Sequence, residues 1–172
     1  MCPSCGYSSS DEFSREFAPR TLNSIKEKIC NNWGDLNYCE ERSVDQAINT
    51  YKLGIYSALL KKEKHIAIAG LYLRLAWIYR THSKEKEEHR FLNLALEEYL
   101  SSYMEDDFSS THLSEIKLFY LIGELSRRTE NDAQAIRYFS MVIEKQKDTT
   151  EKGIVEMAKE QWAEMRKQRK LG

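Results

Sequence analysis

The stretch Phe119–Val142, FYLIGELSRRTENDAQAIRYFSMV, decides the fold of this chain. It holds two runs of apolar residues at helical spacing, separated by a short polar turn. Gly123 on the first run and Ala135 on the second are small, whereas Phe119 and Phe139 are bulky. Small residues let two helices cross closely, and bulky ones fill the space beside the crossing. The stretch therefore predicts an antiparallel helical hairpin that crosses at Gly123 and Ala135.

This order of residues is typical of a tetratricopeptide repeat, a helix–turn–helix unit of about 34 residues. Ser126 departs from the pattern, because it stands where an aromatic residue is usual. A degraded copy lies upstream, and a partial copy of the second helix precedes it. The positions that match are Tyr72, Leu75, Ala76, Tyr79, Leu92 and Ala95 in the degraded copy, and Ala47, Tyr51 and Gly54 in the partial one.

Capping residues extend this pattern along the chain. Ser43 followed by Gln46 is a capping box, Ser83 opens a later helix, and Asp132 can cap the next one. Pro19 suits the first turn of an early helix. With short connections between helices, the chain is predicted to be all-α. We expect about seven tetratricopeptide-like antiparallel helices, stacked in a right-handed array and closed by a C-terminal capping helix at 153–169.

Composition narrows the class of protein. The 172 residues suffice for a sizeable core. With 26 basic and 27 acidic residues, the net charge of −1 argues against a nucleic-acid partner. No run approaches the roughly 20 apolar residues of a membrane span, and the N-terminus lacks the pattern of a signal peptide. We therefore expect a cytoplasmic protein with no membrane partner.

Four segments carry a resemblance to a known family: CPSCGY at 2–7, AGLYLRLAWIYR at 69–80, YLIGEL at 120–125 and MAKEQW at 157–162. The chain resembles an uncharacterised bacterial domain-of-unknown-function family, whose members look like an N-terminal zinc-knuckle region followed by tetratricopeptide-like helices. Members usually carry an earlier Cys-x-x-Cys pair, which this chain lacks. The resemblance therefore implies a remnant of the zinc-knuckle segment at 1–10 and a helical domain at 11–172, and it implies no activity.

Cys2 and Cys5 form a Cys-Pro-x-Cys-Gly knuckle, a shape in which two thiolates can hold one zinc ion. A closed structural site needs four ligands, and Cys30 and Cys39 lack knuckle spacing. We therefore expect no cofactor in this chain and zinc in a longer form. The alternatives are zinc bound within this chain and a redox pair, and the latter lacks the βαβ context of such motifs.

The candidate binding groove follows from the resemblance, because in such arrays the first helix of each hairpin lines a concave face. Aromatic and arginine side chains are good peptide anchors, and arginine pairs well with carboxylates. The competing interpretation is core packing for the aromatic residues and a solvated face for the arginines. The predicted groove residues are Leu73, Trp77, Arg80, Lys117, Tyr120, Glu124, Arg127 and Arg128.

No motif for catalysis is present in the sequence: there is no phosphate-binding glycine loop, no His-Glu-x-x-His and no Gly-x-Ser-x-Gly. The sequence favours a non-catalytic module that binds a protein or peptide in its concave groove. The alternative is a zinc-dependent regulator or nucleic-acid-associated protein that uses the Cys-x-x-Cys segment in its longer form. Self-association as a homodimer is a third possibility.

Overall fold

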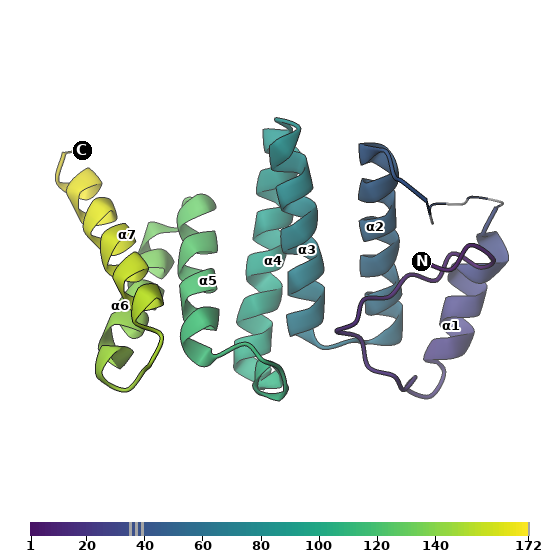
Figure 1. Ribbon diagram of the computed structural model, residues 1–172, viewed down its shortest axis with the longest axis horizontal. Coiled ribbons are helices and arrows are strands. Elements are labelled where there is room, and N and C mark those ends of the chain that lie inside the picture. Colours follow the sequence, from purple (N-terminus) through teal and green to yellow (C-terminus); the bar gives the residue numbers. More distant parts are fainter. Residues whose placement is uncertain (35, 37, 39, 172) are drawn as a thin grey trace. The chain divides into compact units, whose positions relative to one another are not determined.

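The structure, a computed structural model, describes residues 1–34, 36, 38 and 40–171, and side chains up to residue 167. These residues form seven α-helices and three short 3-10 helices, and no strand occurs among them (Figure 1). The prediction of an all-α fold with about seven helices is therefore confirmed. The elements are α1 Thr21–Lys28, η1 Cys30–Asn32, α2 Val44–Lys61, α3 His65–Thr81, α4 Glu85–Glu105, η2 Asp107–Ser110, α5 Glu115–Arg128, α6 Asp132–Glu144, η3 Lys145–Lys147 and α7 Lys152–Leu171.

The chain divides into two compact units, Met1–Glu98 and Tyr99–Gly172, with the boundary inside α4. The first unit holds α1 to α3 and most of α4. The second holds the end of α4 and all that follows. The predicted division into segments 1–10 and 11–172 is a different one, and it stays a prediction.

In the first unit, α3 packs against α2 and forms much of the core. Leu75 and Ala76 of α3 are fully buried, as is Ala58 of α2. The rings of Tyr79 and Phe91 stack with centroids 5.4 Å apart. Helix α3 is apolar almost all round, and such a helix is buried on more than one side.

In the second unit, α5 packs against α6, and α6 packs against α7. A Cβ atom added at Gly123 would lie 2.8 Å from Cε1 of Phe139, so the two helices approach closely at this point. Phe119, Phe139 and Ala135 are at most 1% exposed. The structure therefore confirms a hairpin that crosses at Gly123, as the residue pattern predicts.

Local hydrogen bonds define where helices begin and end. Both bonds of the capping box at Ser43 are present, as predicted. The start predicted at Ser83 is wrong: α4 begins at Glu85, and Ser83 has a φ of 54°. There Lys84 donates to the carbonyl of Tyr79, a hydrogen bond that closes the C-terminus of α3. Ser83 therefore ends one helix instead of capping the next.

Two further starts differ from the prediction. The cap of α6 is Asn131, whose side chain accepts a hydrogen bond from the backbone of Gln134, so Asp132 lies inside the helix. The first helix begins at Thr21, and Pro19 lies just before it, outside its first turn. In the part of the chain that the structure describes, no helix is long and apolar enough to cross a membrane.

Candidate functional site

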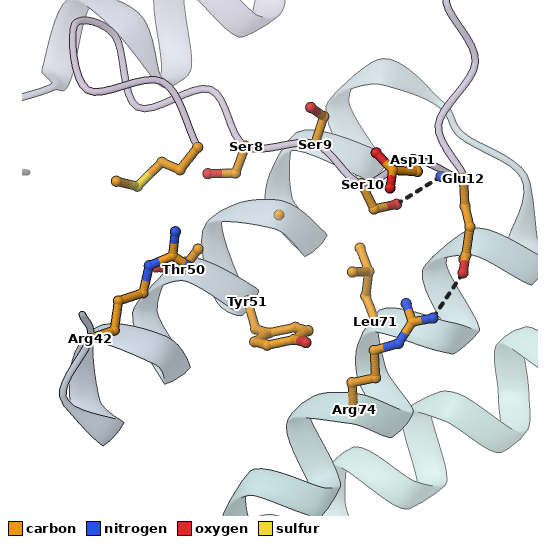
Figure 2. Close-up of a pocket in the computed structure, with 12 residues that line it drawn as sticks. Ser8, Ser9, Ser10, Asp11, Glu12, Arg42, Thr50, Tyr51, Leu71 and Arg74 are labelled. Atoms are coloured by element: carbon orange, nitrogen blue, oxygen red, sulfur yellow. Dashed lines mark hydrogen bonds and ion pairs between the residues drawn. The ribbon is translucent and has the colours of Figure 1, made fainter. Parts of the chain in front are cut away.

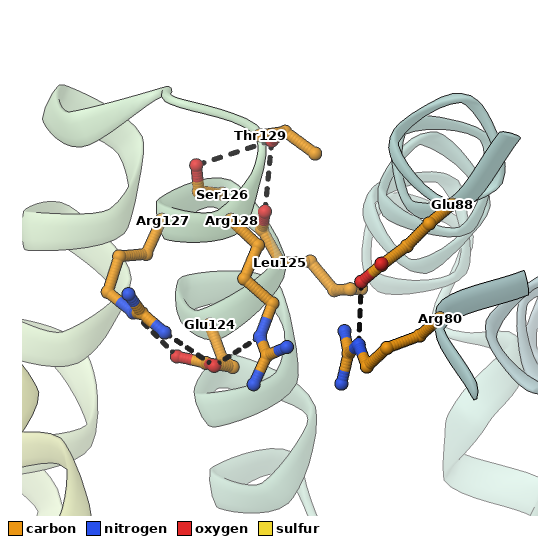
Figure 3. Close-up of polar contacts among 8 residues, drawn as sticks. All are labelled: Arg80, Glu88, Glu124, Leu125, Ser126, Arg127, Arg128 and Thr129. Atoms are coloured by element: carbon orange, nitrogen blue, oxygen red, sulfur yellow. Dashed lines mark hydrogen bonds and ion pairs between the residues drawn. The ribbon is translucent and has the colours of Figure 1, made fainter. Parts of the chain in front are cut away.

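The predicted groove residues lie in both units, and each unit is considered by itself. On α3, Leu73 is 7% exposed and belongs to the core, so it offers no surface to a ligand. Trp77 is 48% exposed, which leaves much of its ring at the surface. Arg80 donates from Nε to Glu88 at 2.6 Å (Figure 3). Of the three, Trp77 fits the predicted role.

A segment that sequence reasoning missed lies against the same unit. Residues 8–17, which we call the N-terminal strap, contact α2 and α3. The backbone of Ser8 donates to the Ser57 hydroxyl at 3.3 Å, and the backbone of Ser14 donates to the Glu63 carboxylate at 3.0 Å. The Lys61 ammonium donates to the carbonyl of Ser14. The strap is therefore held by hydrogen bonds to its backbone.

One side-chain ion pair adds to the hold on the strap. Arg74 of α3 donates to the Glu12 carboxylate at 2.9 Å (Figure 2). The other end of the strap packs on Lys61, whose ammonium lies 4.7 Å from the centroid of the Phe17 ring. A cavity of about 470 Å³ opens beside the strap. Its lining includes Ser8, Ser10, Glu12, Thr50, Tyr51 and Arg74.

Three predicted groove residues of α5, Glu124, Arg127 and Arg128, form a charged cluster in the second unit (Figure 3). Arg127 binds the Glu124 carboxylate through two hydrogen bonds of 2.9 Å, and Arg128 adds a third of 2.5 Å. Burial raises the pKa of Glu124, but hydrogen bonds and charge from the two arginines outweigh it, so the pKa lies below its ordinary value. The Glu124 carboxylate therefore accepts hydrogen bonds from the guanidinium groups of both Arg127 and Arg128.

The other two predicted residues of α5 flank this cluster differently. Tyr120 is half-buried, and its ring lies 5.9 Å from that of Phe139. Burial, together with the nearby Glu124 carboxylate, raises the pKa of Tyr120. Lys117 points to another partner, because its ammonium lies 2.6 Å from the Glu151 carboxylate. The structure thus groups Tyr120 with the arginine cluster and sets Lys117 apart from it.

The predicted metal ligands are neighbours, and the Cys5 thiol lowers the pKa of Cys2. A backbone hydrogen bond from Tyr7 lowers the pKa of Cys5, but burial and the neighbouring Cys2 and Cys30 thiols outweigh it, so that the pKa of Cys5 is raised. Cys39 lies outside the described residues. Within the described ranges, no group of three or more histidine, cysteine, aspartate or glutamate side chains forms a ready metal-ligand set. The proximity of Cys30 to Cys5 was missed because it joins positions far apart in the sequence, which spacing alone does not reveal.

Comparison with known proteins places the chain in a family. Residues 1–165 match a family described as an uncharacterized protein conserved in bacteria (DUF2225). The chain belongs to this family. The expected resemblance to an uncharacterised bacterial family is therefore confirmed at that level, and the family description assigns no activity. No curated protein and no solved structure matches the chain.

Proposed function

We propose that this DUF2225 chain is a non-catalytic protein-interaction module built from tetratricopeptide-like hairpins. It binds an extended segment of a partner protein that carries a carboxylate. The observation that carries the proposal is the N-terminal strap: the α2–α3 hairpin already holds a non-helical segment of the chain, with Arg74 paired to Glu12.

The strap contacts are of a kind that a partner segment could also make. Hydrogen bonds to the backbone of Ser8 and Ser14 do not depend on side-chain identity, so they would suit many sequences. The pair between Arg74 and Glu12 does depend on it, because a guanidinium prefers a carboxylate. Contacts with the backbone would give affinity for any extended segment. The contact with a carboxylate would select segments that carry an acidic residue.

Trp77 supports a docking surface on α3. It follows Arg74 by three residues, and positions three apart lie on the same side of a helix. Its ring is 48% exposed. Tryptophan and arginine are the side chains most enriched among the residues that dominate binding energy at protein interfaces. An aromatic anchor beside a carboxylate-binding group therefore favours a peptide-like partner.

The α5 cluster supports the same class of partner in the second unit. Arg127 and Arg128 share one carboxylate, so the three groups together carry a positive charge. Each guanidinium has five N–H donors, more than Glu124 can accept. Glu160 and Glu164 of α7 act electrostatically on this cluster and would weaken an acidic ligand there. The surplus of donors favours one carboxylate rather than a strongly acidic stretch.

The proposal also assigns the repeat type and the compartment. Gly123 against Phe139 reproduces the small-to-bulky crossing of a tetratricopeptide hairpin. Cys2, Cys5 and Cys30 are free thiols, as expected of the reducing cytoplasm. We therefore place the protein in the cytoplasm.

A peptide array tests the proposed function. Short peptides are made in pairs, with glutamate or glutamine at one position, and binding to the intact chain is measured by fluorescence anisotropy. We expect the glutamate member of each bound pair to bind better. For peptides that dock on α5, Arg127→Ala should weaken that binding about tenfold or more, since a hydrogen bond to a charged group is worth about 1.5–3 kcal/mol. For peptides that dock on α3, Trp77→Ala should weaken binding to both members of a pair.

Arg137→Ala is the matched control, because Arg137 is an exposed arginine of α6 outside the cluster. It should bind the peptides as the unmodified chain does. Equal affinity of the glutamate and glutamine peptides, or unchanged binding by both Arg127→Ala and Trp77→Ala, would contradict the proposal.

A further inference from the structure

The N-terminal strap lies on α2 and α3 without packing closely against them. It contains no helix or strand, and most of its residues are exposed. Even Phe17, an aromatic residue, is 41% exposed. Two cavities, of about 470 and 520 Å³, open against the strap, and Figure 2 shows the first of them. Hydrophobic stabilisation grows with the apolar area removed from water, so burial of its own side chains holds the strap only weakly.

The strap also covers a buried ion pair. The side chains of Lys61 and Glu63 are 2% and 3% exposed, and their charged groups lie 2.5 Å apart. Both touch the strap: Lys61 donates to the carbonyl of Ser14, and the Ser14 N–H donates to Glu63 at 3.0 Å. Removing two charges from water carries a large solvation cost. Departure of the strap returns water to both charges, so the strap is held less firmly than its contacts alone suggest.

The contacts of the strap show which chemistry this surface recognises. Arg74 donates to the Glu12 carboxylate at 2.9 Å, and the Lys61 ammonium lies 4.7 Å from the centroid of the Phe17 ring. A guanidinium group pairs well with a carboxylate, and an ammonium is attracted to the face of an aromatic ring. The surface therefore matches an acidic segment with a carboxylate and, five positions later, an aromatic ring.

We propose that the strap is an internal competitor, which occupies this surface until a partner segment of the same acidic and aromatic chemistry displaces it. This role rests on the proposed function, because it requires a partner for the α2–α3 surface. A tethered segment has an effective concentration on the order of millimolar at its own site. The apparent affinity of the surface for a partner is then reduced to the fraction of chains in which the strap has left.

A peptide with the sequence of residues 8–18, SSSDEFSREFA, is the probe. We expect it to bind the intact chain weakly, and to bind the Glu12→Gln chain about two- to fivefold more tightly, the range that an exposed ion pair provides. Adding Phe17→Ala should tighten binding further. Glu16→Gln is the matched control, since it removes an exposed carboxylate from the same strap and keeps the pair of Glu12 with Arg74. It should leave the affinity unchanged. Fluorescence anisotropy measures each affinity.

Hydrogen exchange reports directly whether the strap leaves. While the strap is docked, the N–H groups of Ser8 and Ser14 donate to side chains outside it, and this slows their exchange. In an isotope-labelled chain, nuclear magnetic resonance follows these two groups without signal from the unlabelled peptide. Saturating peptide should speed the exchange of both. Circular dichroism checks that each variant is helical.

One more variant identifies the surface that the peptide uses. The intact chain should prefer the peptide to a version with glutamine in place of the glutamate that corresponds to Glu12, and Arg74→Ala should remove this preference. Peptide binding with unchanged strap exchange and equal affinity for the intact and Glu12→Gln chains would overturn the proposal. The proposed function would survive that result, because the chain would still bind an acidic segment. No binding even to the doubly substituted chain would also overturn the proposal, whereas the paired peptides described above test the proposed function separately.

Discussion

Gly54 and Gly123 are both buried in helices of packed pairs, α2 with α3 and α5 with α6, yet they meet different surroundings. A Cβ atom at Gly123 would lie 2.8 Å and 2.9 Å from two atoms of the Phe139 ring. At Gly54, the nearest atom would be Cδ1 of Leu71, at an ordinary contact distance of 4.0 Å. Glycine is therefore a steric requirement in the α5–α6 hairpin, whereas in the α2–α3 pair there is room for a methyl group.

The comparison shows that a small residue in a repeat pattern does not by itself establish a close helix crossing. The side chain that faces the small residue decides whether the two helices cross closely there. Opposite Gly123 stands a rigid ring with no exposed surface, which cannot move aside easily. Opposite Gly54 stands the end of a leucine at full contact distance. Three substitutions test this difference, and a fourth tests the charged cluster of α5. They follow from the largest expected effect to the smallest.

Phe139→Ala should have the largest effect. Phe139 is fully buried in the α5–α6 hairpin. Removing a buried phenylalanine side chain typically lowers the free energy of unfolding by about 3–5 kcal/mol. Urea unfolding followed by circular dichroism at the helical band measures the loss. A loss below about 1 kcal/mol would mean that Phe139 does not fill the crossing.

Gly123→Ala should lower the free energy of unfolding by about 1–3 kcal/mol, because the added methyl group overpacks against the Phe139 ring. Phe139→Leu provides the test of mechanism, since a smaller and more flexible side chain makes room for the methyl group. In a double-mutant cycle, the two changes together should cost less than their sum. Strict additivity would place the strain elsewhere.

Gly54→Ala should raise the free energy of unfolding by about 0.5–1 kcal/mol. The new methyl group meets no close atom, and alanine loses less conformational freedom than glycine inside a helix. The same urea experiment compares it directly with Gly123→Ala. If Gly54→Ala destabilises the protein as much as Gly123→Ala does, the two helix pairs are equivalent and the contrast is wrong.

Glu124→Gln should have the smallest effect, a loss of about 0.5 kcal/mol at neutral pH, as for partly exposed helical ion pairs. The folded pKa of Glu124 lies below the ordinary value of 4.5, so its stabilisation is present above that value and disappears as the pH falls through the folded pKa. Urea unfolding at pH 7 and under acid should show the difference shrinking. A difference that grows with acidity would contradict this sign.

The sequence alone determined the all-α class, the helix start at Ser43 and the crossing at Gly123. These features depend on local spacing: capping at Ser43 involves residues three apart, and apolar periodicity identifies a helix without reference to the rest of the chain. The errors at Ser83 and Asp132 are also local. At Asp132 the neighbouring Asn131 caps the helix instead, and at Ser83 the positive φ belongs to the end of the preceding helix.

Only the tertiary structure decided which side chains form candidate sites. Helix α3 is apolar almost all round, so its pattern does not reveal which side stays open, and Leu73 proved buried while Arg74 holds the strap. The close approach of the Trp33 ring to Gly6 and the ion pair of Arg74 with Glu12 join segments distant in the sequence. Such contacts depend on how the folded chain returns on itself, and no local spacing encodes them.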